Sequence, residues 1–562
     1  MLPLCLWAIV NWWHAGREVA RFYIDSPVWD YLSTIDHYAR YKAGDLRVFW
    51  VQHNEHRIVF PEAIIALDLL YFRGRILLPT LLSFALYVGI WFVMVWAFAK
   101  DRSVMSLPRY AAIFLAAILM AWTGCAASLG SPFLLQWTMN QFAAILSLVL
   151  LAKLSVSGRR FWLLLLALSG VICTYSSGNG LLLWPLLLCL AVSLRLAWRQ
   201  ISIIALAGAL STGLYFSGYK QLGTLNWRVV LTHPAYLTKF MAAYVSMPFA
   251  VLRAETDFGV RIGLISLVAL ALLLLRAWHA RLLATPTGIV LFGYAAFILG
   301  SGLMIALGRM NPDDPLIEIA KAPRYLTLPL TYWGMLAIVS IWVLARTPFM
   351  GTILATGVAV GLSLLLFRMS HKPAFNSFSD SVATGYATQQ WSALAVEAGI
   401  LDPVPDLILH PDNRFVPRVI PLMRAEKLSL FSTPEPFWIG REVNAIFPGP
   451  LRRPASGGII ASQKLQTAVT VAGWTNERST LFHHLELVFV DENNRIVGLG
   501  ERLPAGLPKC FAKLTIPPDR QWSGFVNLTY GSHNVSSYIV TEDGHALIPM
   551  SGNFSIDAAQ ER

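Results

Sequence analysis

The chain has 562 residues, of which 56% are hydrophobic and only 14% are charged. A soluble domain usually carries about 25% charged residues, so the composition excludes a wholly soluble protein, and equally a disordered, collagen-like or coiled-coil chain. The formal charge of +12 does not require nucleic acid as a partner, because basic residues of membrane proteins gather in short cytoplasmic loops. The five cysteines form no disulfide framework and no CxxC site.

About eleven apolar segments are candidates for membrane-spanning helices, since a span needs roughly 20 apolar residues. Their approximate positions are 2–14, 77–99, 110–128, 132–152, 161–174, 181–194, 201–217, 260–275, 286–307, 324–345 and 348–367. Short loops with Lys or Arg alternate with short loops that have neither, and the positive-inside rule places the first set in the cytoplasm. The N-terminus is then cytoplasmic, and the segments that face outward are 15–76, 218–259, 308–323 and the chain after 368.

The sequence predicts three domains. Residues 1–367 form a polytopic helical membrane domain whose first outer loop is 15–76, and residues 368–454 form a helical linker. Residues 455–562 form a small antiparallel β-sandwich, with strands expected at 466–474, 483–490, 495–501, 509–515, 523–530 and 537–541. This outer domain is interpreted as a cap or interaction module; sugar binding through Trp474, Trp522 and Tyr530 is the alternative, and aromatic core packing explains these residues equally well.

The first outer loop concentrates polar and aromatic side chains. Asp25 and the pair Trp29-Asp30 follow the first span, an amphipathic helix is expected at about 31–43, and the run QHNEHR occupies 52–57 just after Trp50. A solvated loop does not need tryptophan beside such groups. A site at the outer membrane surface would use the aromatics as anchors, a carboxylate as a base and the cations to hold a lipid phosphate.

Each of these groups also has a structural interpretation. Asp30 could cap the following helix, and Asp25 before Ser-Pro is typical of a turn. His53, Glu55 and His56 could hold a metal ion, because His and Glu are zinc ligands, although the loop offers no clear fourth ligand. The whole cluster could also be a hydrogen-bonded loop that binds nothing.

Two downstream motifs are also candidates. The run SSGNG at 176–180 is either a tight turn or a place where a substrate approaches the backbone. Arg324 begins an apolar segment at its expected outer end, where it could bind a lipid phosphate or simply extend to the membrane interface. Lys321 and Arg309 flank the same loop and could assist, or could balance the adjacent acids at 313–314, which favour a rigid turn.

Together these motifs resemble a group of bacterial polytopic membrane proteins that are similar to glycosyltransferases of the GT-C fold. The resemblance extends over most of the chain, and HNEHR is its most specific part. The matching residues are Trp29-Asp30, the 52–57 run with Pro61, the 176–180 run with Trp184-Pro185, Arg324-Tyr325 and Gly473-Trp474.

The resemblance implies a transferase that moves a sugar from a polyprenyl-phosphate donor to a glycan, lipid or protein acceptor at the outer face of the bacterial inner membrane. GT-C enzymes usually carry an essential acid in the first outer loop, and Asp30 matches that position as the general base. The group often has Trp-Asp-Glu, whereas this chain has Trp29-Asp30-Tyr31, so the role of the acid falls on Asp30 alone. The loop has no Asp-x-Asp motif, and no metal or other cofactor is predicted.

The leaving phosphate needs fixed donors, and the planar, permanently charged guanidinium of arginine suits this role. We expect membrane lipid and the lipid-linked sugar to be bound by His53, Asn54, Glu55, His56, Arg57, Arg324 and Tyr325, with Asp25, Lys321 and Arg309 as secondary candidates.

Three other functions stay open. A transporter or flippase of lipid-linked saccharide usually has ionisable residues at the membrane midplane, whereas the charged residues here concentrate in the outer loops. A surface-glycan polymerase or ligase would use closely related chemistry. A protein that merely displays its C-terminal domain would need one span rather than many.

Overall fold

The computed structural model describes residues 2–555 except 22, 24–25, 102–103, 105, 222–226, 251–255, 315–316, 347–356, 358–372, 413, 478–485, 503–519 and 528–533. These residues form two compact units. Unit 1 consists of Met1–Tyr23, Asp45–Ile64 and Pro79–Phe378, and unit 2 consists of Ile24–Gly44, Ile65–Leu78 and Ser379–Arg562.

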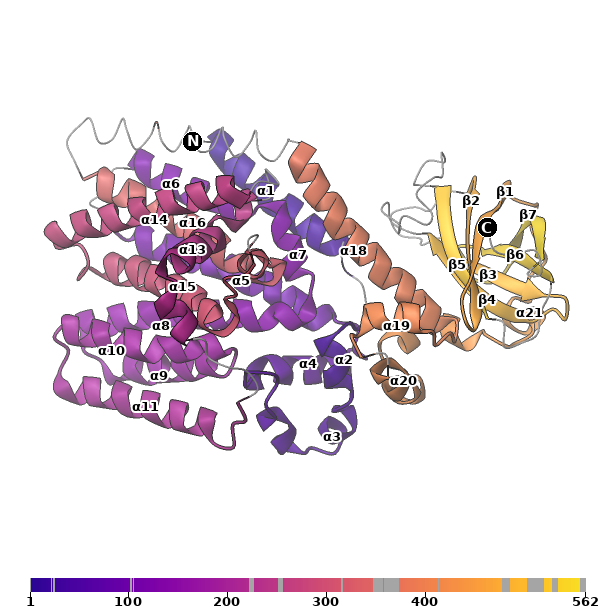
Figure 1. Ribbon diagram of the computed structural model, residues 1–562, viewed down its shortest axis with the longest axis horizontal. Coiled ribbons are helices and arrows are strands. Elements are labelled where there is room, and N and C mark those ends of the chain that lie inside the picture. The colour runs from indigo at the N-terminus through magenta and orange to yellow at the C-terminus, as the bar shows by residue number, and fades with distance from the viewer. Residues whose placement is uncertain are drawn as a thin grey trace. The chain divides into compact units, whose positions relative to one another are not determined.

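Unit 1 is a bundle of helices (Figure 1). Its helices are α1 (Leu2–Arg21), α5 (Leu77–Ala99), α6 (Ser106–Met120), α7 (Ala126–Leu129), α8 (Leu135–Ser157), α9 (Arg160–Thr174), α10 (Leu183–Ser193), α11 (Trp198–Phe216), α12 (Trp227–Thr232), α13 (Pro234–Ala250), α14 (Thr256–His279), α15 (Pro286–Arg309) and α16 (Thr327–Leu344). Helix α4 (Val59–Tyr71) begins in unit 1 and ends in unit 2, and α18 (Pro373–Glu397) does the same.

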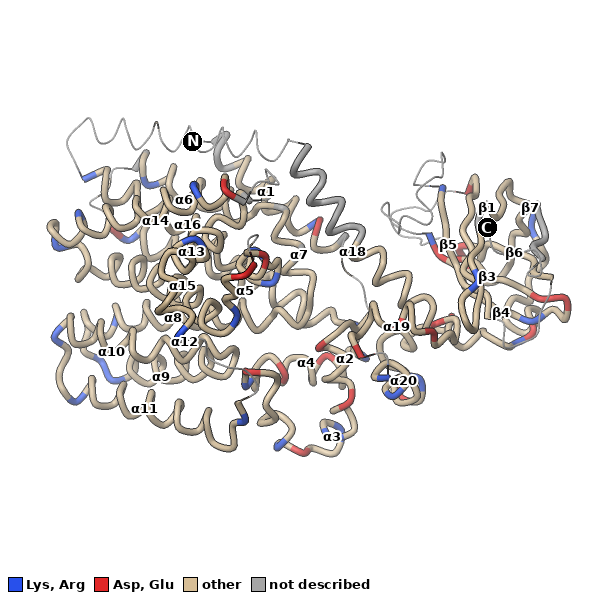
Figure 2. The backbone as a smooth tube through the Cα atoms, viewed as in Figure 1, with Lys and Arg blue, Asp and Glu red and all other residues tan. Residues whose placement is uncertain are grey.

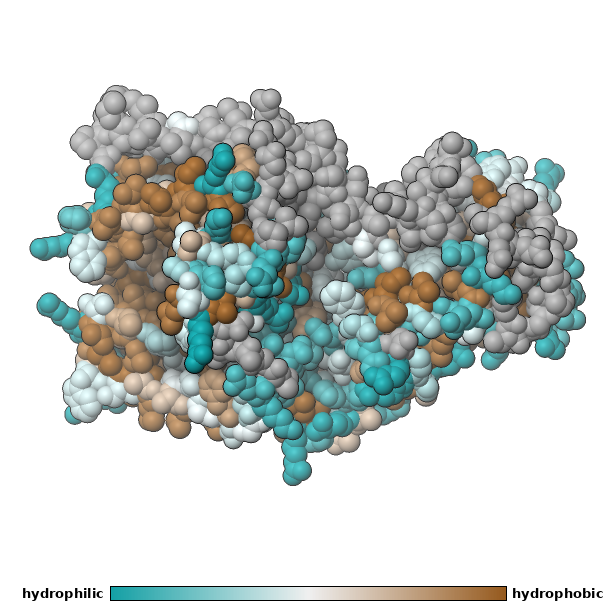
Figure 3. Space-filling model, in the orientation of Figure 1, coloured by the Kyte–Doolittle hydropathy of each residue, from teal (hydrophilic) through white to brown (hydrophobic). Residues whose placement is uncertain are grey.

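Five helical segments of unit 1 are long and apolar enough to cross a membrane, namely 77–99, 132–157, 257–279, 286–309 and 327–344. Helix α11 exposes an apolar stripe at helical spacing, with Ile203, Leu206, Leu210 and Leu214 each about half exposed. Helix α14 exposes a similar stripe from Ile265 to Leu275. Figure 3 shows broad hydrophobic areas on the visible face of this unit, and Figure 2 shows Lys and Arg near the ends of α9, α10, α11 and α14. Faces of this kind suit lipid better than water.

A helix overlaps each of the first ten predicted spans, whereas the eleventh, 348–367, lies almost wholly outside the described residues. Only five described segments reach the length and apolarity of a span, so the number eleven and the GT-C fold stay predictions. The segment 218–259, expected to be an outer loop, contains α13, which packs against α14 and α16.

Unit 2 joins two pieces of the predicted outer loop to the C-terminal residues. Its helices are α2 (Asp30–Ile35), α3 (Tyr38–Lys42), α19 (Pro403–Leu409), α20 (Phe415–Glu426) and α21 (Val443–Ile446). Arg418 pairs with Asp36 at 2.9 Å, and Lys42 pairs with Glu426 at 2.8 Å. These pairs connect the α2–α3 segment with α20, although exposed ion pairs of this kind contribute little stability singly.

The helix predicted at 31–43 is in fact two short helices, α2 and α3, with a break at 36–37. The Thr34 hydroxyl donates to the carbonyl oxygen of Tyr31 at 2.7 Å. Thr and Ile are weak helix formers, and a hydroxyl bonded to the backbone favours a helix end. The amphipathic pattern is confirmed, because Leu32, Ile35 and Tyr38 on its apolar side are all buried.

The strands of unit 2 form one antiparallel sheet of seven, in the order β1-β2-β5-β4-β3-β6-β7. Their bounds are β1 Gly457–Lys464, β2 Ala468–Thr475, β3 Glu486–Asp491, β4 Ile496–Arg502, β5 Gln521–Asn527, β6 Asn534–Val540 and β7 Leu547–Ser555. The predicted sandwich of two sheets is therefore wrong for the described strands. The strand expected at 509–515 lies outside the described residues.

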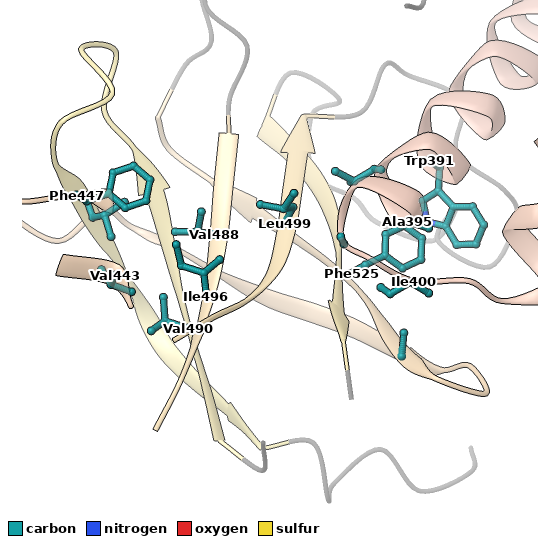
Figure 4. Packing of buried hydrophobic residues seen from close by; sticks show 14 residues of the cluster. Trp391, Ala395, Ile400, Val443, Phe447, Val488, Val490, Ile496, Leu499 and Phe525 are labelled. Carbon is teal, nitrogen blue, oxygen red and sulfur yellow. The ribbon is translucent and has the colours of Figure 1, made fainter. Parts of the chain in front are cut away.

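Both faces of the sheet are buried along its central strands β2, β3, β4 and β5, whereas β6 alternates between buried and partly exposed residues. On β3, Leu487 and Phe489 join one core, and Val488 and Val490 join the other. The end of α18 covers the face that carries Val488 and Val490, and the Trp391 ring there lies 4.8 Å from the ring of Phe525 (Figure 4). Trp522 is fully buried in the first core, so it is a packing residue and not a sugar platform.

Candidate functional site

The run QHNEHR forms a tight backbone hairpin in unit 1. The N–H of His53 donates to the carbonyl oxygen of His56 at 2.8 Å, and the N–H of His56 returns the bond at 2.8 Å. Asn54 takes a positive φ of 48° at the turn, a conformation that Asn tolerates better than most residues. The exposed Asn54 amide also contacts His53 Nε2 at 3.2 Å. The hairpin therefore presents His53, Asn54 and Glu55 at its tip.

Arg57 fastens this hairpin to the end of α11. Its side chain is buried, and its Nε donates to the carbonyl oxygen of Tyr215 at 2.6 Å. Its two terminal nitrogens donate to the carbonyl oxygens of Trp50 and of Ser217. The guanidinium also lies over the Trp50 ring at 5.1 Å. Arg57 thus places the loop, because its donors are engaged by three backbone carbonyls.

Residues at the end of α11 and just after it make further contacts with the same loop. The hydroxyls of Tyr215 and Tyr219 each lie 3.2 Å from the carbonyl oxygen of Glu55. The amide of Gln52 donates to the carbonyl oxygen of Lys220 at 2.7 Å and accepts from its N–H at 2.8 Å. Sequence reasoning missed the two tyrosines, because nothing in the pattern of α11 distinguishes them from interface aromatics.

His56 joins the hairpin to the 176–180 segment, whose last three residues begin the 3₁₀ turn η4 (Gly178–Leu182). The N–H of Gly178 donates to His56 Nδ1 at 3.3 Å, so the neutral ring carries its proton on Nε2. The pKa of His56 is lowered to about 4, chiefly by burial; Glu55 opposes this shift, and Arg309 and His53 add to it. His56 is therefore a neutral acceptor at neutral pH.

Two polar side chains of this segment lack hydrogen bonds. Ser177 Oγ and Asn179 Nδ2 are buried and have no partner among the described residues. A buried polar group without a partner costs about 1–3 kcal/mol. The Asn179 amide therefore has a donor without a partner among the described residues.

Glu55 and Arg309 form an ion pair of 3.4 Å, with both side chains about 40% exposed. Arg309 ends α15, so this pair connects the hairpin tip with a third segment of unit 1. Lys321 pairs with Glu318 at 3.1 Å. Both cations were secondary candidates, and both have carboxylate partners.

Arg324 and Tyr325 lie in the 3₁₀ turn η6 (Pro323–Tyr325) just before α16. Tyr325 is buried against Trp137 at 5.3 Å, with the rings edge to face. Arg324 is half-buried, and its guanidinium lies 5.0 Å from the Tyr325 ring. Arg324 forms no hydrogen bond or ion pair with any residue that the structure describes. Among the candidate cations, its N–H donors are therefore the ones that could bind an anion.

Asp30 belongs to unit 2, where it is the first residue of α2. Trp29, and not Asp30, occupies the cap position of this helix, and the Trp29 side chain makes no cap hydrogen bond. Trp29 has φ 52° and ψ −122°, a conformation that favours glycine and costs a larger residue about 1–3 kcal/mol. Its N–H donates to Leu409 at 2.6 Å, and its indole donates to Ile408 at 3.1 Å, both to carbonyl oxygens.

The remaining candidates give a mixed picture. Asp25 lies outside the described residues. Among the residues that the structure describes, no group of three or more His, Cys, Asp and Glu side chains is placed to hold a metal ion. In unit 1 the structure brings together the 52–57 hairpin, the 176–180 segment and Arg309.

Comparisons of the chain with protein families, with curated proteins and with solved structures found no match.

Proposed function

We propose that the chain is a membrane glycosyltransferase that takes a sugar from a polyprenyl-phosphate donor and passes it to a hydroxyl group of an envelope acceptor. The five long apolar segments and the exposed apolar stripes of α11 and α14 support a membrane setting. The resemblance to GT-C enzymes supports the reaction class. Under this proposal the site faces outward and the cationic short loops face the cytoplasm.

The backbone at Trp29 is the observation that carries the proposal. A strained residue persists only where its surroundings force it, and such residues concentrate at functional sites. Here the strain lies immediately before Asp30, and two hydrogen bonds from Trp29 to the end of α19 maintain it. A precisely placed acid is what a general base requires.

The reaction breaks the bond between the anomeric carbon of the sugar and the donor phosphate oxygen. The acceptor oxygen forms the new bond to that carbon, and Asp30 takes the proton of the acceptor hydroxyl. The polyprenyl phosphate leaves with the bonding electron pair, so its negative charge grows in the transition state. In unit 1, Arg324 is our first choice for binding a phosphate, because its guanidinium carries a permanent charge and has no hydrogen-bond or ion-pair partner among the described residues.

The remaining residues divide into binding and positioning roles. The Asn179 amide is suited to bind a sugar hydroxyl or a phosphate oxygen, since a ligand would supply its missing partner. Arg57 holds the hairpin that carries His53, Asn54 and Glu55. This assignment changes the expected role of Arg57 from phosphate binding to positioning.

The proposal is tested with the full-length protein in detergent and a panel of radiolabelled polyprenyl-phosphate sugars mixed with crude envelope acceptors. A transferase consumes donor in detergent, where no membrane separates two compartments. A flippase consumes none there, but moves the donor across sealed vesicles. Donor consumption that Asp30→Asn abolishes supports the proposal, whereas translocation without consumption overturns it.

A further inference from the structure

A pocket of about 690 Å³ lies at the other end of several unit 1 helices, away from the residues discussed above. The end of α5, the last turns of α8, the beginning of α9 and the beginning of α15 contribute its walls, together with Arg346 after α16. These are the loops that the positive-inside rule assigns to the cytoplasm. Cations that are far apart in the sequence therefore lie around one pocket.

The charges around this pocket are unbalanced. Lys100, Lys153, Arg159 and Arg346 are the cations, and Asp101 is the one carboxylate among the described lining residues. Asp101 accepts from Arg346 at 2.5 Å and from the indole of Trp342 at 2.8 Å. Lys100 and Lys153 have no hydrogen bond or ion pair with described residues, so their charges are available to an anion.

Tryptophan rings hold the two lysines in place. The Lys153 ammonium lies 4.2 Å from the Trp162 ring and 5.2 Å from the Trp96 ring. The Lys100 ammonium lies 3.8 Å from the same Trp96 ring. Cation–π contacts of this kind restrict a flexible lysine without neutralising it. Both ammonium groups are therefore arranged for a ligand before it binds.

The rest of the pocket favours an amphiphile over a small soluble anion. Ala97, Val149, Ala152, Val156 and Val290 supply apolar walls. On α9, Phe161, Leu164 and Leu168 are more than half exposed beside Trp162. The pocket also includes Thr285 and Pro286 at the start of α15, where the helix dipole favours negative charge.

We propose that this pocket binds the phosphate headgroup of an anionic phospholipid, with the acyl chains along the apolar faces beside it. Basic pockets between membrane helices on the cytoplasmic side are suited to such lipids. The inference requires the chain to span a membrane, but it does not depend on glycosyl transfer.

The test uses the full-length protein in nonionic detergent and measures its melting temperature against added dioleoylphosphatidylglycerol. Dioleoylphosphatidylcholine and inorganic phosphate serve as separate arms. We expect a saturable rise in melting temperature with the anionic lipid alone. An equal rise with phosphatidylcholine overturns headgroup recognition, and an equal rise with inorganic phosphate overturns the lipid as the source of the anion.

The decisive variant is Lys100→Gln/Lys153→Gln, for which the half-saturating lipid concentration should rise about thirtyfold. Arg276→Gln/Arg281→Gln is the matched control, because it removes two exposed cations of the same set of loops that do not line the pocket. Equal losses in both variants overturn the proposal. Should the lysine variant not fold, Arg159→Gln replaces it, since its exposed side chain predicts a rise of about fivefold without a packing defect.

Discussion

The backbone N–H of Gly178 donates to Nδ1 of His56 at 3.3 Å, although the two residues are separated by more than a hundred positions. This bond joins the SSGNG segment to the QHNEHR hairpin, the two motifs that most distinguish the sequence. It also explains the glycine, because a Cβ at position 178 would lie 2.7 Å from that nitrogen and 3.2 Å from the Tyr215 hydroxyl.

Gly178→Ala should therefore destabilise unit 1 by about 1–3 kcal/mol, since an added methyl group in a packed site forces its neighbours apart. The measurement is the melting temperature in detergent. Gly213→Ala is the control, because position 213 lies in α11 with open space around it, and alanine favours a helix over glycine. A stabilised Gly178→Ala variant would contradict the described contact.

Arg57→Gln should destabilise the protein by about 3 kcal/mol or more, because the carbonyl oxygens of Trp50, Tyr215 and Ser217 lose a charged donor. Arg47→Gln, at an exposed position of the same loop, should stay within about 0.5 kcal/mol of the wild type. The melting temperatures of the two variants make the comparison. If Arg57→Gln loses donor turnover but keeps wild-type stability, Arg57 binds substrate and does not merely position the loop.

The stability of the hairpin should decrease in acid. The pKa of His56 is about 4 in the folded chain, against an ordinary value of 6.5, so the unfolded chain binds more protons between these values. His56 therefore contributes to the free energy of unfolding. This contribution is fully present above about pH 6.5, where it amounts to about 3 kcal/mol, and it is lost as the pH falls towards 4.

His56→Gln isolates this effect, because a glutamine carbonyl can still accept from Gly178 but does not titrate. The melting temperature of the wild type should fall more steeply than that of the variant between pH 6.5 and 4. Asp406 and Glu486 in unit 2 have pKa values raised to about 7, and they oppose the trend equally in both proteins. Parallel pH profiles would show that His56 is not held neutral.

The Trp29→Gly variant should show whether the backbone strain at position 29 affects donor turnover independently of stability. Glycine adopts the φ of 52° without cost, so the lost indole contact and the relieved strain should nearly cancel in the melting temperature. The backbone before Asp30 becomes freer, and we expect donor turnover to fall at least about tenfold. Trp29→Phe keeps the strain and loses the indole hydrogen bond to Ile408, so it should be the less stable variant.

Apolar runs allowed much of the helical bundle to be predicted. The segment predicted at 77–99 coincides with α5, because an unbroken apolar run of that length has few alternatives. The edge strands β1 and β7 were missed, since β1 begins with two glycines and β7 contains Pro549, which are weak strand signals. Buried β-strands of the middle of the sheet were easier to predict.

The candidate site depended on contacts that no local pattern encodes. The backbone of Trp29 is set by Leu409, and the guanidinium of Arg57 is engaged by carbonyls of α11. Composition identified these residues as unusual for a solvated loop, but it did not distinguish a ligand-binding arginine from a positioning one. To make this distinction, one must know the hydrogen-bond partners of each arginine, and these are seen only in the structure.

The central claim is that Asp30 is the base of a sugar transfer, and its most direct test is the rate of polyprenyl-phosphate release by Asp30→Asn. Asp36→Asn is the control, since this carboxylate lies in the same loop and pairs with Arg418. At equal amounts of folded protein, Asp30→Asn should release the product at least about a hundredfold more slowly than the wild type, and Asp36→Asn should stay within about twofold. Equal release by the wild type and Asp30→Asn would contradict the account.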